Sequence, residues 1–246
     1  MTKYGKWLGG TLGWAFGGPV GALLGFAIGA VIDTAEFEVQ TMNGGAQNMR
    51  RPPSTSGDFS VSLLVLSAAV MKADGRPMKS ELEYIRNFFV TQFGESKATQ
   101  DMLVLKDLLK KEIPLLQVCT QIRQFMPLPQ RLQLLHYLFG IAKADGFVDK
   151  REVEVIYTIS SYLGIADPEF NSLKAMYFRD VNSDYKILES EASASNDEIK
   201  KAYRKMALKY HPDKVSQLGE ELQKGAKEKF LKVQQAYDNI RKQRGF

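Results

Sequence analysis

Few side chains in this sequence are of the types that catalyse reactions. The 246 residues include one cysteine, Cys119, and two histidines, His136 and His211. A single cysteine excludes an internal disulfide framework and a four-cysteine zinc module. The sequence also lacks a nucleophile–base arrangement and a phosphate-binding glycine loop. We therefore expect a binding protein without a cofactor rather than an enzyme, with Cys119 and His136 in the core.

The most specific pattern surrounds the second histidine. Ser195 and Glu198 have the spacing of a capping box, which begins a helix. Pro212 disfavours helical geometry at the residue before it, so we predict that this helix ends near Tyr210. One side of the helix is apolar and the other side is basic. The apolar positions are Ile199, Ala202, Met206 and Tyr210, and the basic positions are Lys200, Lys201, Arg204, Lys205 and Lys209.

The basic helix lies in the part of the chain that carries most of the excess positive charge. The whole chain has a net charge of +5, and residues 182–246 contain 14 Lys/Arg and 10 Asp/Glu. Such a module suits an acidic partner, and the three candidates are nucleic acid, an anionic membrane surface and an acidic protein. We also predict a short helix over 184–188 and a longer one over about 220–242, where apolar residues recur with helical spacing.

Residues 184–246 resemble the J domain of the DnaJ family. The resemblance rests on IKKAYRKMALKYHPDK at 199–214 and on KFLKVQQAYDNI at 229–240. It implies a helical hairpin that docks on an acidic surface of a DnaK-type heat-shock chaperone in its ATP state and triggers ATP hydrolysis. The trigger would be the loop of His211, Pro212 and Asp213. The docking residues would be Lys200, Tyr203, Arg204 and Lys205.

Two other interpretations of the basic helix remain. It is a solvated surface, or it is a patch that binds nucleic acid. A helix that reads DNA needs base-contacting polar side chains and usually a helix-turn-helix partner, and we find neither. We therefore expect no nucleic-acid partner.

The middle of the chain has the periodicity of helices and contains a repeat. Apolar residues recur every three or four positions within 59–73, 81–93, 101–111, 115–126, 131–144, 151–163 and 169–178. The sequence KADG occurs at 72–75 and again at 143–146, and each copy is followed by a glutamate, Glu81 or Glu152. Each copy is therefore predicted to be an apolar helix, an Asp-Gly turn and a second, amphipathic helix.

This repeated pattern resembles the TerB-like (tellurite-resistance) helical domain. The resemblance implies a helical bundle whose acidic residues bind a metal or a partner, and the candidates here are Asp74, Glu81, Asp145 and Glu152. A purely structural interpretation is stronger. Asp-Gly suits a turn, a glutamate in the first helical turn complements the helix dipole, and a calcium loop offers five or more oxygens. We therefore predict no metal site.

The N-terminal segment has the properties of a membrane anchor. Residues 7–32 contain no charge, and as a helix of about 39 Å they would cross a bilayer. Glycines recur every four residues from Gly5 to Gly29, which forms a stripe along one helix face where a second helix can approach closely. The packing residues would be Gly13, Gly17, Gly21, Gly25 and Gly29. A short apolar hairpin broken at residues 17–19 is the alternative.

Together these patterns predict an all-α protein. The predicted parts are a glycine-zipper transmembrane helix (1–33), a linker (34–57), a TerB-like helical bundle (58–180) and a J-domain helical hairpin (181–246). This order resembles the DjlA-like family of membrane-anchored co-chaperones of the DnaJ type. It implies a protein of the cell inner membrane with one span, which forms a homodimer or higher oligomer through its anchor.

Two observations predict opposite orientations of the anchor in the membrane. Lys3 and Lys6 precede the apolar run, and Asp33, Glu36 and Glu38 follow it, so a literal positive-inside reading leaves the domains outside the cytoplasm. A DnaK-type partner and its ATP are cytoplasmic, and on that ground we expect the domains to face the cytoplasm.

The alternative function is a membrane-associated stress or metal-response sensor that acts through the TerB-like domain.

Overall fold

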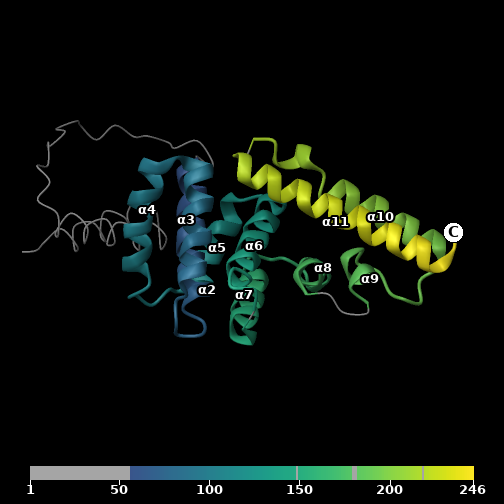
Figure 1. The fold of residues 1–246 in the computed structure, drawn as a ribbon, viewed down its shortest axis with the longest axis horizontal. Coiled ribbons are helices and arrows are strands. Elements are labelled where there is room, and N and C mark those ends of the chain that lie inside the picture. The colour runs from purple at the N-terminus through teal and green to yellow at the C-terminus, as the bar shows by residue number, and fades with distance from the viewer. Residues whose placement is uncertain (1–55, 148, 179–181, 218) are drawn as a thin grey trace, which may run out of the picture.

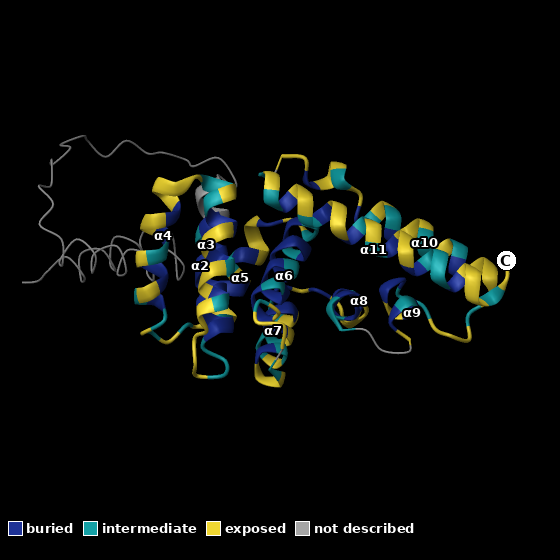
Figure 2. Cartoon of the chain, viewed as in Figure 1, coloured by how far each residue is buried: buried dark blue, intermediate teal, exposed yellow. Residues whose placement is uncertain are grey.

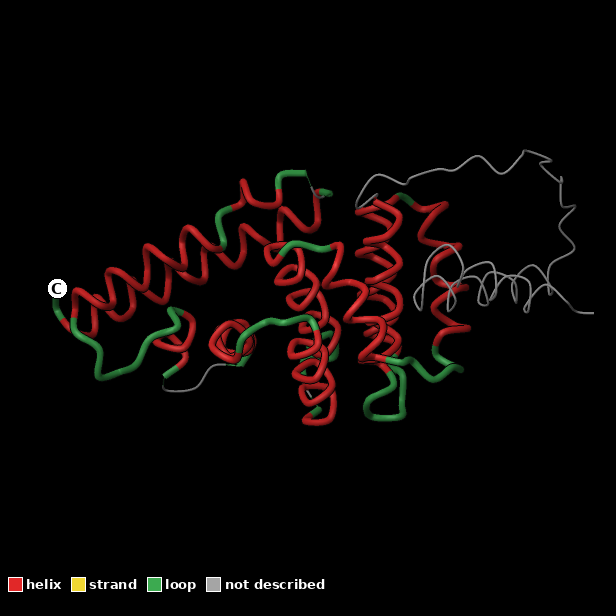
Figure 3. The backbone as a smooth tube through the Cα atoms, turned by 180° about the vertical axis from the view of Figure 1, so that it is seen from behind, coloured by secondary structure: helices red, strands yellow, loops and turns green. Residues whose placement is uncertain are grey.

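The computed structural model describes residues 56–147, 149–178, 182–217 and 219–246, and every regular element within them is a helix (Figures 1 and 3). The predicted all-α class is confirmed for these residues. The predicted transmembrane helix with its glycine stripe lies outside them. Among the described helices, none has the length and apolar character to span a bilayer.

The first part of the described chain is a bundle of seven helices. They are α2 (Ser56–Met71), α3 (Lys79–Phe93), α4 (Glu95–Leu108), α5 (Leu115–Phe125), α6 (Leu128–Ala142), α7 (Lys150–Tyr162) and α8 (Asp167–Tyr177). Helix α2 is central because it packs against α4, α5, α6 and α7. Its residues from Leu63 to Met71 are almost entirely buried, as is most of α6 (Figure 2).

The repeated KADG sequence ends the two central helices in the same way. Gly75 follows α2 and Gly146 follows α6, with φ angles of +80° and +87° that glycine adopts without strain. The Asp74 carboxylate accepts a hydrogen bond from the amide of residue 76 at 2.8 Å, and the Asp145 carboxylate accepts one from the amide of residue 147 at 2.9 Å. In both copies the repeat is thus a pair of helices joined by an Asp-Gly turn, α2–α3 and α6–α7.

The helix boundaries agree with the prediction except at α4. The apolar spacing predicted a helix over 101–111, whereas α4 begins at Glu95 and ends at Leu108. Its first turn contains only one buried residue, Ala98, so apolar periodicity gave no signal there. The helix begins after Gly94, whose φ of +85° reverses the chain between α3 and α4.

The C-terminal part is a hairpin of two long helices. It comprises α9 (Ser183–Ile187), α10 (Asn196–Lys209), a 3₁₀ turn η1 (Pro212–Val215) and α11 (Glu220–Arg244). Helices α10 and α11 pack against each other, and Ile199 and Met206 of α10 and Val233 and Ile240 of α11 are fully buried. Figure 1 shows the hairpin extending from the bundle towards the C-terminus.

The hairpin and the bundle share one apolar core. The first part of α11 packs against α3 and α6, and α9 packs against α8. The buried apolar residues form one contiguous cluster from Leu63 in α2 to Ile240 in α11. The surface of the hairpin is therefore held in a fixed position relative to the bundle.

Candidate functional site

Helix α10 begins at the capping box that the sequence predicts. The Ser195 hydroxyl accepts a hydrogen bond from the Glu198 amide at 3.3 Å, and the Glu198 carboxylate accepts one from the Ser195 amide at 2.7 Å. The backbone hydrogen bond lowers the pKa of Glu198. Two amides of the first turn are satisfied in this way, which fixes the start of the basic helix.

The four predicted docking residues differ in their surroundings. Arg204 is exposed, and Lys205 is 66% exposed although it pairs with Glu189 at 2.8 Å. Lys200 is half-buried, 3.4 Å from Asp197 and over the ring of Phe246.

The Tyr203 ring stacks on Tyr237 of α11, with ring centres 4.3 Å apart. Tyr203 therefore packs the hairpin, while Arg204 and Lys205 present charge to solvent.

The loop of His211, Pro212 and Asp213 lies at the end of α10. His211 Nδ1 accepts a hydrogen bond from the Asp213 amide at 3.3 Å, which makes His211 the cap of the 3₁₀ turn. Its ring lies nearly perpendicular to that of Phe230 of α11, with ring centres 6.0 Å apart. The Asp213 side chain is 89% exposed and that of His211 is 47% exposed. The loop is thus anchored on the inside and accessible on the outside.

An ion cluster that the sequence analysis missed joins this helix to the bundle. Lys209 Nζ lies 2.5 Å from carboxylate oxygens of both Glu169, in α8, and Glu189, after α9. Burial opposes ionisation of Glu189, but hydrogen bonds from Lys205 and Lys209 outweigh it and lower its pKa. The side chains of Lys209, Glu169 and Glu189 are all at most 15% exposed.

A second contact between hairpin and bundle involves a buried lysine, also missed. Lys229 of α11 is fully buried and donates to the Leu132 carbonyl of α6 at 3.3 Å, and its ammonium group lies over the Tyr210 ring. Desolvation lowers its pKa well below the usual value. Lys229 follows Ala226 by three residues and precedes Val233 by four. Its place on the apolar face was therefore visible in the sequence.

The core predictions for two residues come out differently. Cys119 is fully buried in α5, as expected, and burial raises the pKa of its thiol to about 12. His136 is half-buried in α6. Its Nδ1 atom and the Tyr177 hydroxyl form a hydrogen bond of 2.5 Å, and its ring faces Gly225 of α11. It therefore lies where the bundle meets the hairpin.

The four acidic candidates of the repeat line one cavity of about 680 Å³. Asp74 and Asp145 close their own turns, as described above. Glu81 accepts a hydrogen bond from the Met78 amide at 2.6 Å, and Glu152 accepts one from the Asp149 amide at 3.1 Å. Each acid therefore has a local structural role.

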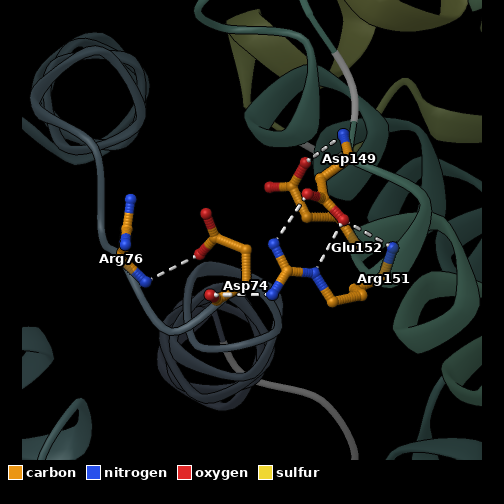
Figure 4. A network of polar contacts seen from close by, with 5 residues as sticks. All are labelled: Asp74, Arg76, Asp149, Arg151 and Glu152. Atoms are coloured by element: carbon orange, nitrogen blue, oxygen red, sulfur yellow. Dashed lines mark hydrogen bonds and ion pairs between the residues drawn. The ribbon is translucent and has the colours of Figure 1, made fainter.

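Arginine bridges the two copies of the repeat at this cavity. Figure 4 shows Arg151 between the Asp149 carboxylate, at 2.8 Å, and the Asp74 carbonyl oxygen, at 3.2 Å. Hydrogen bonds from Arg151 lower the pKa of Asp149 to about 2. Within the described residues, no three His, Cys, Asp or Glu side chains are grouped closely enough to hold a metal ion.

The two glutamates of the repeat affect each other. Glu81 is 4% exposed and Glu152 is 7% exposed, and a hydrogen bond joins their carboxyl groups. Burial, followed by the neighbouring Glu152, raises the pKa of Glu81 to about 8, and burial also raises that of Glu152. The pair holds a proton near neutral pH and links α3 to α7.

Comparison with protein families gives three matches along the chain. Residues 1–48 match the co-chaperone DjlA transmembrane domain, residues 60–175 match the tellurite resistance protein TerB, and residues 183–244 match the DnaJ domain. No solved structure significantly matches the chain.

Several curated relatives align with the chain over most of its length. One is the co-chaperone protein DjlA of Coxiella burnetii, which is 26% identical and aligns over 99% of both chains. The same-named proteins of Pasteurella multocida (26% identical, 100% of both chains) and Vibrio vulnificus (29% identical, 77% of this chain and 79% of the relative) are also similar. With the three domain matches in this order, the chain is similar along its whole length to the DjlA co-chaperones.

Proposed function

We propose that this protein docks on a DnaK-type heat-shock chaperone through its J domain and stimulates the ATP hydrolysis of that chaperone. The observation that carries this proposal is the loop of His211, Pro212 and Asp213, which is anchored on α11 and exposed at the end of a capped basic helix. Such a loop is positioned to contact a partner without rearranging.

The docking surface is the outer side of α10. Arg204 and Lys205 supply exposed positive charge for an acidic partner surface, Lys200 adds to it near the start of the helix, and Tyr203 holds the helix on α11. Exposed charges of this kind speed association and make it sensitive to salt. His211, Pro212 and Asp213 act as the trigger once the helix has docked.

The remaining parts of the chain determine where this happens. In this proposal residues 1–33 are a single transmembrane anchor, 34–57 are a linker, 58–180 are the TerB-like bundle and 181–246 are the J domain. The match of residues 1–48 to a DjlA transmembrane domain supports the anchor. The anchor lies in the inner membrane, its glycine stripe pairs two or more copies, and the domains face the cytoplasm.

The test is single-turnover ATP hydrolysis by a DnaK-type chaperone with increasing amounts of the full chain. We expect stimulation by the wild type and its loss in His211→Gln and in Asp213→Asn. Asp238→Asn, which makes the same chemical change on α11, is the matched control and should stimulate normally. A folded wild-type chain that leaves the hydrolysis rate unchanged would refute the proposal.

A further inference from the structure

A groove of about 390 Å³ lies where the bundle and the J domain meet. Ala166 and Pro168, at the start of α8, form its bundle side. Lys205 and Leu208 of α10 and Lys214 of η1 line its J-domain side. The two sides are therefore parts of different domains, and neither domain forms the groove alone.

The shape of the groove is fixed by the ion cluster at its base. Lys209 is held by both Glu169 and Glu189 at 2.5 Å, and these three side chains are largely buried. The contact of Lys229 with the Leu132 carbonyl holds the same two domains together from α11. The groove is thus a fixed part of the surface rather than a gap between two domains that move independently.

The chemistry of the groove is apolar with a basic rim. Ala166 and Pro168 are exposed, and Leu208 is an exposed large apolar side chain at 66%. The two glutamates are largely buried and paired with lysines, whereas Lys205 and Lys214 are exposed. The segment that complements this surface carries an apolar side chain beside acidic residues.

The groove is continuous with the proposed docking surface. Lys214 directly follows Asp213, Leu208 precedes His211 by three residues, and Lys205 is one of the docking residues. Leu208 also continues the exposed side of α10 that runs from Lys201 through Arg204 and Lys205. The loop, this side of α10 and the groove therefore form one continuous surface, and a partner that covers the first two also contacts the groove.

We propose that the groove binds an acidic segment of the DnaK-type partner with one apolar side chain, so that the TerB-like bundle forms part of the docking surface. This inference rests on the proposed function. It assigns a direct binding role to Ala166 and Pro168, which lie outside the J domain. The bundle then does more than carry the J domain at the membrane.

The experiment measures single-turnover ATP hydrolysis by the chaperone against the concentration of full chain. Ala166→Glu places a negative charge in the groove, which repels an acidic segment, yet it leaves intact the backbone hydrogen bond from residue 166 to Glu169. Gln124→Glu adds the same side chain at an exposed position of α5, which packs against α2 and α7. Leu208→Ser removes the apolar contact from the J-domain side.

We expect Ala166→Glu to raise the half-maximal concentration about fivefold to tenfold, Leu208→Ser to raise it also, and Gln124→Glu to leave it unchanged. Equal half-maximal concentrations for the wild type and both groove variants would overturn the inference while the proposed function stands. So would a change in self-association of Ala166→Glu with normal stimulation, because the groove would then bind a second copy. No stimulation by the wild type would instead refute the proposed function.

Discussion

Glu81 and Glu152 make the stability of the bundle depend on pH. The raised pKa of Glu81 means that the folded chain holds a proton that the unfolded chain releases at lower pH. This contribution is fully present below the unfolded value of 4.5 and is lost as the pH rises towards about 8. The pair therefore weakens the fold most at alkaline pH.

Glu81→Gln should remove this loss, because a neutral amide replaces the protonated acid and still accepts the Met78 amide hydrogen bond. We expect the free energy of unfolding of the variant, relative to wild type, to increase by about 2 kcal/mol between pH 5 and pH 8.5. Urea unfolding of the full chain at each pH measures it. The exposed Glu83→Gln is the control, and parallel profiles for all three proteins would show that the pair does not share a proton.

Lys229 is a second residue whose burial affects stability, with the opposite dependence on pH. Its folded pKa is lowered, so the unfolded chain binds a proton that the folded chain does not, up to the unfolded value of about 10.4. The free energy of unfolding therefore rises with pH in the window between the lowered pKa and about 10.4.

Lys229→Met should stabilise the protein, because an apolar side chain of similar length avoids the desolvation of an ammonium group. We expect the free energy of unfolding to increase by about 1 kcal/mol at pH 7 and to depend less on pH up to pH 10. Lys227→Met, at an exposed position of the same helix, is the control in the same urea titrations. A loss of stability in Lys229→Met alone would mean that the lysine contributes more by its hydrogen bond and its contact with Tyr210 than burial costs.

At the scale of the elements, α10 depends on its N-terminal cap. Ser195→Ala removes the side-chain acceptor of the Glu198 amide and should lower the free energy of unfolding by about 1 kcal/mol. Ser193→Ala, in the exposed turn before the helix, should change it little. Urea unfolding gives the difference, and amide hydrogen exchange at Glu198 locates it. Equal exchange at Glu198 in both variants would contradict the assigned cap.

The elements were largely predictable because their signals are local. The capping box of α10, the proline after it and the Asp-Gly turns of the repeat all act within a few residues, and each appears in the structure. The start of α4 was not predictable from periodicity, because a helical turn with one buried residue has no apolar pattern. Capping signals failed there too, since Gly94 provides no side-chain acceptor.

The candidate site was predictable only in part, for a physical reason. The basic side of α10 and the exposed loop were visible in the sequence. The pairing of Lys209 with Glu169 was not, because the charge of a lysine does not reveal whether it faces water or an acid 40 residues away. The same holds for Glu189, whose two lysine partners lie on the next helix.

At the scale of the whole molecule, the bundle and the J domain form one body. Their apolar cores are continuous, and the contacts of Lys209 and Lys229 join them through polar groups. A J domain fixed on a TerB-like bundle presents its loop in one orientation. Because the proposed linker separates the anchor from the bundle, this orientation is fixed relative to the bundle and not relative to the membrane.

The most direct test of this account is co-flotation of a DnaK-type chaperone with lipid vesicles that carry the full chain. We predict that the chaperone floats with the vesicles in ATP but not in ADP, that raised salt weakens the association, and that Asp213→Asn abolishes it while Asp238→Asn does not. A chaperone that stays at the bottom of the gradient in ATP, with the wild-type chain in the floated vesicles, would contradict membrane recruitment through the J domain.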